Sequence, residues 1–332
     1  MSECGCGGDP KEIRNIPTEL RFGDRIGALK VRLGIGRDSY KIPPGLYSVG
    51  TPNGTSPVFV SANYKLTFDS LRKELGGLDC YILILDTKGI NVWCAAGKGT
   101  FGTEELVNRI AKTGLSEVVS HRDLILPQLG APGMCAHEVK RRSGFNVIYG
   151  PVRASDIKKF LAAGMEATPE MRTVKFTARD RTVLTPMEFI PGMKLSMLVF
   201  GMLFLANFIA KEPFGTHDLY IYLGAVIVGT VITPILLPII PVSAFSLKGW
   251  ILGVCWTAYA VWAYGWLPDD LLTAFGYLLV LPSLSAFFAM NFTGASTYTS
   301  FSGVIREMRM AVPIIFVTIA VGAVLLFIGR VI

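Results

Sequence analysis

Cys94 is the residue of this chain whose type and surroundings are best suited to chemistry. It lies in segment 91–101, which reads NVWCAAGKGTF and follows a short apolar run. Asn91 suits the position before a helix and Gly97 the position where one ends, so we expect a short helix over 92–96. Cys94 would occupy its first turn, where N–H groups and the helix dipole favour a thiolate, the form that binds metals. A small buried hydrophobic cysteine is the open alternative.

Strand and helix patterns alternate around this segment in the first half of the chain. The predicted strands cover 57–61, 80–86, 115–120 and 146–150. The predicted helices cover 66–75, 103–114 and 154–163. This alternation predicts a mostly parallel, doubly wound, Rossmann-like α/β sheet. Ligands of such sheets lie beyond the C-terminal ends of the strands, which here are followed by 86–98, 120–127 and 149–153.

Nucleotide and nucleic-acid binding are weak interpretations of this half. No G-x-G-x-x-G follows the first strand and no G-x-x-x-x-G-K-[ST] occurs, although Gly97-Lys98-Gly99-Thr100 is similar to the end of a phosphate loop. The net charge of the chain is +7, and all of this excess lies before residue 183. Because no nucleic-acid motif accompanies it, the charge favours an anionic lipid surface or an acidic partner.

The second half of the chain predicts a membrane domain of five transmembrane helices, each of about 20 apolar residues. They cover 191–210, 219–242, 249–267, 271–292 and 311–330. We therefore expect an N-terminal segment, an α/β domain, a basic linker and a membrane domain, over 1–49, 50–165, 166–190 and 191–332. Ionisable groups are nearly missing from the span interiors, which favours an anchor or docking platform over a conduit for a neutral or soft substrate.

The soluble half is predicted to lie in the cytoplasm. The N-terminus has no apolar stretch typical of a signal peptide, and Lys and Arg are concentrated before the first span and in the second and fourth connections. An odd number of spans with the N-terminus inside fits this distribution. The six cysteines would then be reduced thiols or metal ligands instead of disulfides.

The residues around Cys94 resemble a known family. NVWCAAGKGTFGTEEL, HRDLILPQLGAPG and GFNVIYGPVRASDI, within roughly 50–165, are similar to the corrinoid-binding domain of the corrinoid iron–sulfur protein of the acetyl-CoA pathway. In that family a short helix lies under the lower axial face of the corrin, and threonine is usual at the position of Cys94. Cysteine there, joined to a membrane domain, resembles a narrower group, the corrinoid protein of the bacterial and archaeal mercury-methylation pair. Its motif N-[VI]-W-C-A-[AG]-G-K is matched throughout 91–98.

This resemblance implies a cobalamin-type corrinoid as cofactor, with Cys94 as the catalytic residue and the ligand of its cobalt. The cofactor-binding residues that it implies are Asn91, Val92, Trp93, Cys94, Ala95, Ala96, Gly97, Lys98, Thr100, Phe101, Ser120, Leu129, Gly130 and Gly150. Trp93 and Phe101 would flank the corrin as apolar walls, with core packing as the alternative for Phe101. Lys98 would contact a corrin amide or stay solvated.

The activity implied by the resemblance is corrinoid-dependent methyl transfer. A methyl-pterin donor, or its methyltransferase, would supply methyl to cobalt(I), and methyl-Co(III) would deliver it to Hg(II) as methylmercury. A thiolate ligand donates electrons along the axis and favours departure of methyl as a carbanion or radical. A non-catalytic membrane-anchored methyl carrier for a separate synthase is the alternative, and a transporter with a regulatory corrinoid domain is a third interpretation.

Two departures from the iron–sulfur relatives bear on partners and metals. Cys4 and Cys6 are too few for a [4Fe–4S] site, so the resemblance implies a ferredoxin-like partner with two [4Fe–4S] clusters. The corrinoid motif D-x-H-x-x-G is also missing, because neither His121 nor His137 has the required neighbours. Cys4 and Cys6 would either pass Hg(II) to the site as soft thiolate ligands or have no such role.

Overall fold

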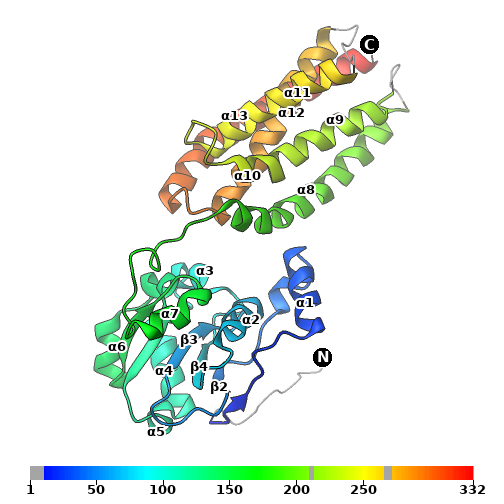
Figure 1. The fold of residues 1–332 in the computed structure, drawn as a ribbon. Helices are drawn as coiled ribbons and strands as arrows, with labels where there is room; N and C mark the ends of the chain where they lie inside the picture. The colour runs from blue at the N-terminus through cyan, green and yellow to red at the C-terminus, as the bar shows by residue number, and fades with distance from the viewer. Residues whose placement is uncertain (1–10, 209–212, 265–270, 332) are drawn as a thin grey trace. The chain divides into compact units, whose positions relative to one another are not determined.

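The computed structural model describes residues 11–208, 213–264 and 271–331. Cys4 and Cys6 lie outside these residues, so their role in Hg(II) transfer stays a prediction. The chain forms two compact units, one of residues 1–31 and 35–174 and the other of 32–34 and 175–332 (Figure 1). The first unit extends beyond the expected 50–165 domain at both ends. At its N-terminal end, two strands that precede residue 50 join the sheet.

The first unit is built on a six-stranded mixed sheet with the order β1-β2-β4-β3-β5-β6. Its strands are β1 (Arg14–Asn15), β2 (Gly45–Val49), β3 (Val58–Ala62), β4 (Cys80–Leu85), β5 (Asp123–Pro127) and β6 (Asn146–Gly150). β2 pairs antiparallel with β4, whereas β4, β3, β5 and β6 are mutually parallel. β4 is buried along its whole length, as its continuous apolar sequence predicts.

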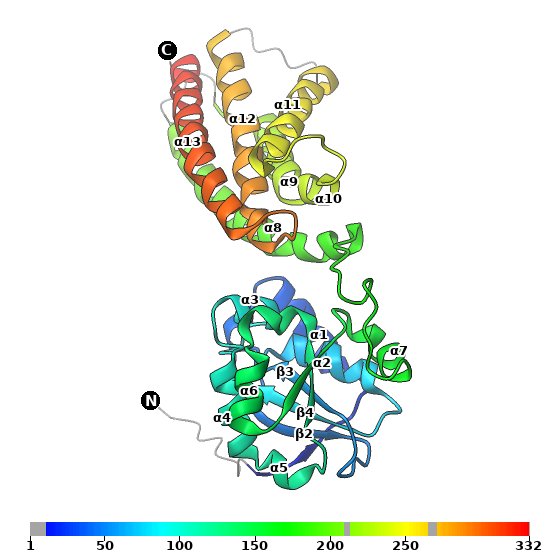
Figure 2. The ribbon, with the colours of Figure 1, turned by 90° about the vertical axis from the view of Figure 1, so that its left-hand side faces the viewer.

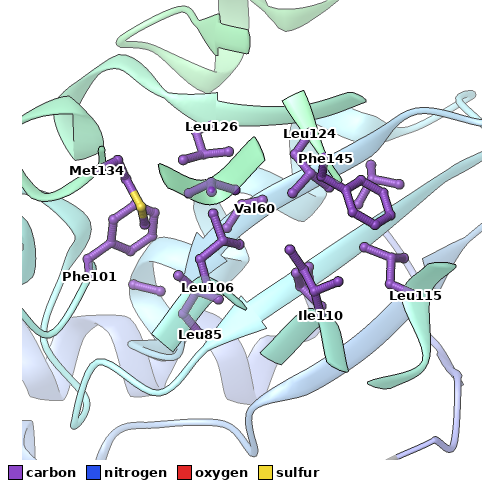
Figure 3. Packing of buried hydrophobic residues seen from close by; sticks show 14 of the residues in the cluster. Val60, Leu85, Phe101, Leu106, Ile110, Leu115, Leu124, Leu126, Met134 and Phe145 are labelled. Atoms are coloured by element: carbon purple, nitrogen blue, oxygen red, sulfur yellow. The ribbon is translucent and has the colours of Figure 1, made fainter. Parts of the chain in front are cut away.

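Helices cover both faces of this sheet. They are α1 (Phe22–Arg32), α2 (Lys65–Arg72), α3 (Val92–Gly97), α4 (Thr103–Thr113), α5 (Leu115–Val118), α6 (Ala136–Ser143) and α7 (Ile157–Ala162). On one face, α3 to α6 bury a cluster that includes Phe101, Leu106 and Phe145 (Figure 3). On the other face, α2 and α7 contribute Phe68 and Phe160. The expectation of an α/β domain is confirmed, whereas the sheet is mixed because β2 runs antiparallel to β4, and the Rossmann-like assignment stays a prediction.

The predicted strand over 115–120 is wrong. Gly114 has a left-handed backbone (φ 62°), which ends α4 and lets Leu115 begin the short helix α5. The strand of this region is β5, whose buried apolar run of three residues is too short for a clear pattern. Ser120 therefore precedes a strand, and its N and Oγ both donate to Gly54 O, at 2.8 and 2.9 Å.

The second unit is helical. It contains α8 (Ala178–Ala206), α9 (Thr216–Ile227), a π-helical turn (Val228–Ile232), α10 (Thr233–Leu236), α11 (Phe245–Tyr264), α12 (Leu271–Asn291) and α13 (Phe301–Val331). Within the described residues, four helices are long and apolar enough to cross a membrane. They are Ala178–Leu205, Thr216–Leu236, Leu271–Ala295 and Ser302–Arg330. These four correspond to the first, second, fourth and fifth predicted spans.

The predicted third span, 249–267, falls on α11 as far as residue 264, and 265–267 lie outside the described residues. This helix holds three tryptophans and Lys248, which lower its mean hydropathy. It packs antiparallel to α12, with Gly249 facing Ala289 and Gly253 facing Pro282. α12 lies between α11 and α13 and packs against both (Figure 2). Within the described residues, α11 is not among the helices that meet the criterion for spanning, so four of the five predicted spans are found.

Arg181 and Lys248 of the second unit are buried instead of exposed. Arg181 donates to Ile235 O at 2.9 Å and to Phe176 O at 2.7 Å. Lys248 Nζ donates to Leu237 O and Ile240 O at 2.6 and 2.7 Å. Both side chains thus satisfy carbonyls around the end of α10, where a helix leaves its last C=O groups without partners.

Candidate functional site

The short helix expected around Cys94 is confirmed as α3. Asn91 has an extended backbone, and its side-chain oxygen accepts a hydrogen bond from Cys94 N at 2.9 Å. Ala95 N donates to Asn91 O at 2.9 Å, which begins the helical pattern. The side chain that caps α3 therefore binds the backbone amide of the cysteine itself.

The buried side of α3 anchors it to the core of the first unit. Val92, Ala95 and Ala96 are buried in the cluster that includes Phe101. Trp93, by contrast, is 40% exposed, and Cys94 is half-buried. The helix therefore presents its tryptophan at the surface and its cysteine near the surface while its small residues pack inward.

The 3-10 segment η3 (Gln128–Gly133) follows β5 and packs directly against α3. A Cβ atom at Gly130 would clash with the Phe101 ring, and one at Gly133 would clash with the Phe101 carbonyl and lie 3.1 Å from Ala96 Cα. Glycine is therefore required for this close approach. Phe101 has no exposed surface, so it supports η3 from beneath, and the expectation that it forms a wall against a ligand is wrong.

Asn63, which sequence reasoning missed, orders the loop between β4 and α3. This side chain is 2% exposed, and its Oδ1 accepts hydrogen bonds from Thr87 N, Thr87 Oγ1 and Gly89 N at 3.1, 2.9 and 2.9 Å. Burial opposes ionisation of Asp86, but its hydrogen bonds with Lys88 prevail and lower the pKa of this carboxyl. Asn63 follows β3, and the loop that it orders follows the adjoining strand β4. The ends of these two strands together therefore fix the position of Asn91.

A pocket of about 350 Å³ lies at the C-terminal edge of the sheet, beside the first turn of α3. The β3–β5 pair has one register partner, Phe59↔Ile125, whereas β3–β4 and β5–β6 each have five. β3 and β5 therefore separate toward their carboxyl ends. Because the chain passes from β3 to β4 on one side and returns to β5 on the other, this is the topological switch point, where open α/β sheets bind ligands.

The pocket brings together part of the predicted set of site residues. Asn91, Val92, Trp93, Leu129 and Gly150 line it, and Cys94 lies in the same turn. Sequence reasoning missed Ser61, Thr67, Ser70 and Leu71, which line the same pocket from β3 and α2. Ser61 lies at the end of a predicted strand, and the other three lie on the predicted helix that follows it. The sequence pattern could therefore have indicated that they lie near the C-terminal edge of the sheet.

The remaining predicted site residues lie outside the pocket lining. Ala95, Ala96, Gly130 and Phe101 are buried supports, whereas Gly97 and Lys98 are exposed and Thr100 is half-buried at the end of α3. Ser120 lies at the N-terminal edge of the parallel strands, opposite the pocket, because it follows a helix instead of a strand. The prediction that Ser120 contributes to a site at the C-terminal edge is therefore wrong.

The described cysteines and histidines of the first unit lie in different environments. Burial raises the pKa of Cys80 to about 12, which keeps this core residue a thiol. Cys135 is exposed and lies 3.5 Å from the His137 ring nitrogens. His121 Nε2 lies 2.9 Å from Ser56 O, toward the N-terminal edge of the sheet. No group of three or more metal-binding side chains occurs among the residues described here.

Comparisons with known proteins show what part of the first unit is similar to. Residues 35–161 match the family of the CO dehydrogenase/acetyl-CoA synthase delta subunit. The acetyl-CoA decarbonylase/synthase complex subunit gamma of Methanopyrus kandleri is 32% identical over 127 residues, which are 38% of this chain and 27% of that relative. The corrinoid/iron-sulfur protein large subunit of Moorella thermoacetica is 31% identical over 127 residues, 38% and 28% of the two chains.

These relatives are similar to the α/β unit. The chain spans less than a third of the length of the curated relatives it matches, and the matched residues end before the helices of the second unit begin. The first unit thus has a domain similar to these complex subunits, whereas the helical unit lies outside the match.

Proposed function

We propose that this chain is a membrane-bound, corrinoid-dependent methyltransferase. It takes a methyl group from a methyl-pterin-type donor and transfers it to Hg(II), forming methylmercury. The observation that carries this proposal is Cys94 on the capped helix α3, beside a pocket at the switch point of a sheet. The similarity to a protein named as a corrinoid/iron-sulfur large subunit supports the corrinoid part of the proposal.

The residues at the sheet edge suit a corrinoid. The pocket of about 350 Å³ is near the lower end of the range for small-molecule sites, so it suits one arm of the cofactor instead of the whole macrocycle. Gly97 and Gly99 adjoin open space, where an added Cβ would meet nothing. Gln128 Oε1 is buried without a hydrogen-bond partner among the described residues. Asn91, Trp93, Leu129 and Gly150 would hold the cofactor, with Cys94 as the ligand of its metal.

Asn91, Trp93 and Cys94 would have separate roles in this chemistry. A corrinoid would supply a cobalt ion that accepts and releases a methyl group. Cys94 would bind this metal as a thiolate, whose electron donation favours delivery of methyl to an electrophile such as Hg(II) over delivery of a methyl cation to a nucleophile. Asn91 restrains the thiolate through the Cys94 amide, and Trp93 offers an apolar surface beside it.

The second unit would hold this chemistry at the membrane. We propose that α11 completes five spans, because it lies antiparallel beside α12. The excess of Lys and Arg before residue 183 supports a cytoplasmic position for the α/β unit in the cell membrane. Arg181 is 5% exposed, so a docking surface for a partner on the second unit would use the exposed Lys175 and Arg179.

A ferredoxin-like protein with two [4Fe–4S] clusters is the proposed electron donor, since the described residues hold no cysteine set for such a cluster. In this scheme the chain needs an external low-potential donor to return from an inactive oxidised state. Turnover with the methyl donor and Hg(II), with and without this partner and a reductant, tests the requirement. Sustained methylmercury formation without any electron donor would contradict it.

The second candidate function is a non-catalytic, membrane-anchored corrinoid methyl carrier for a separate synthase. The names of the relatives favour it, because they are subunits of a decarbonylase/synthase complex. Such a carrier does not require a thiolate at position 94, so this residue distinguishes the two functions.

The test uses the full-length chain loaded with corrinoid, together with Cys94→Ala and Cys94→Thr. Both variants should fold and retain corrinoid, because the Asn91 cap and the pocket lining remain. Their optical spectra should lack sulfur-to-metal charge transfer, and methylmercury formation should fall at least a hundredfold. Unchanged spectra and activity in Cys94→Thr would exclude the thiolate role, whereas a corrinoid-loaded parent chain that forms no methylmercury would leave the carrier.

A further inference from the structure

The helical unit contains a cavity of about 680 Å³ among α8, α9, α12 and α13. Apolar side chains of these helices form nearly all of its wall, including Phe200, Leu284 and Ile319. Met202 on α8 and Phe316 on α13 belong to the wall and are 56% and 58% exposed. The cavity therefore reaches the outer side of the bundle, which faces hydrocarbon in a bilayer.

Three polar side chains belong to the cavity wall: Asp218, Tyr222 and Tyr277. Asp218 is paired with Arg330 at 3.1 Å and also accepts a hydrogen bond from the Tyr277 hydroxyl. All four residues are at least nine-tenths buried. The aspartate and arginine charges cancel, so this part of the wall offers hydrogen bonds without net charge.

Tyr222 differs from the other polar residues of the wall. It lies one helical turn after Asp218, and its hydroxyl has no hydrogen-bond partner among the described residues. Ser196 is a polar neighbour close to this hydroxyl, but the Ser196 hydroxyl donates to Gly192 O at 2.8 Å, and the distance and angle between the two hydroxyls do not make a hydrogen bond. A buried hydroxyl without a partner costs free energy that a ligand oxygen would recover.

We propose that this unit binds one amphiphilic molecule of the bilayer, with its hydrocarbon chain in the cavity and a carbonyl or hydroxyl oxygen at Tyr222. A cavity of this size with an apolar wall excludes ordered water, which needs several polar partners. The surrounding membrane supplies hydrocarbon chains along the outer side of the cavity. A glycerolipid and an isoprenoid quinone share the required chemistry, namely a long apolar body with an oxygen at one end. This inference does not depend on methyl transfer.

The experiment reconstitutes the full-length chain in nanodiscs of phosphatidylethanolamine and phosphatidylglycerol with added menaquinone. The protein is then moved into detergent, and the molecules that it retains are identified by native mass spectrometry. We expect one retained molecule per chain. Its mass assigns it to a glycerolipid or to the quinone, and either result supports the proposal.

Two pairs of variants locate the retained molecule. Ala323→Phe places a ring in the cavity and should strongly lower retention, whereas Val324→Phe, on an exposed position outside the wall, should leave it unchanged. Tyr222→Phe keeps the ring and should lower retention roughly fivefold, whereas Tyr220→Phe on the exposed side of α9 should have no effect. Absence of a retained molecule on the parent chain, or equal retention by parent and Ala323→Phe, would overturn the proposal.

Discussion

Polar side chains have different partners in the two units. Around α3, Asn63 and Asn91 accept hydrogen bonds from backbone N–H groups and thereby order a loop beside solvent. In the helical unit, Asp218 is paired with Arg330, and Lys248 satisfies two carbonyls. Water can replace a lost partner at the sheet edge but has little access among the helices. The same kind of substitution should therefore have a larger effect in the helical unit.

The largest effect is expected from Asp218→Asn. It leaves the buried Arg330 charge without its carboxylate, and breaking a buried ion pair from one side costs about 3–5 kcal/mol. Denaturant titration of the full chain in detergent, followed by helical circular dichroism, measures the loss. Asp180→Asn at the exposed start of α8 is the matched control and should cost about 1 kcal/mol. Equal losses in both variants would remove the distinction between the units.

Ala95→Pro should have the next largest effect. Proline removes the N–H that donates to Asn91 O, and within a helix it costs about 3 kcal/mol. Loss of corrinoid retention and a lower unfolding temperature of the α/β unit are the expected readouts. Gly97→Ala is the control for the unfolding temperature, because its Cβ would meet no protein atom within 4 Å. Normal retention by Ala95→Pro would contradict the role of α3.

Gly133→Ala tests the contact between η3 and α3. The added Cβ would meet the backbone of Phe101 and Ala96, so the two segments must separate at a cost of about 1–3 kcal/mol. Gly54→Ala, whose Cβ would make ordinary contacts at 3.7 Å and beyond, should change stability little. Thermal unfolding compares the two, and an unperturbed Gly133→Ala would mean that this contact is not close in solution.

The smallest effect is expected from Asn91→Ala. Removal of the cap costs about 1 kcal/mol, and water can reach the freed Cys94 amide because the cysteine is half-buried. Methylmercury formation should fall in part, through a misplaced thiolate, while corrinoid retention changes less. Asn91→Asp keeps an accepting oxygen and should restore most of the activity. A loss as large as that of Ala95→Pro would place Asn91 in direct contact with the reactants.

The local features of the site could be predicted from sequence, and the distant ones could not. α3 is specified by neighbours within a few residues, since Asn91 and Gly97 define its ends. β5 was missed because its buried run is short and follows a Gly114 turn that ends one helix and begins another. The Asp218–Arg330 pair joins positions 112 residues apart, and no local pattern relates them.

The sparse pairing between β3 and β5 has a consequence for how the first unit opens. The two halves of its sheet, β2-β4-β3 and β5-β6, are each well paired internally but share one register partner. Units of this kind tend to open cooperatively along their weakest seam. Native-state hydrogen exchange should therefore detect a sub-global opening at this seam. The free energy of opening should be lower for the amides of β3 and β5 that face the seam than for the amides between β3 and β4.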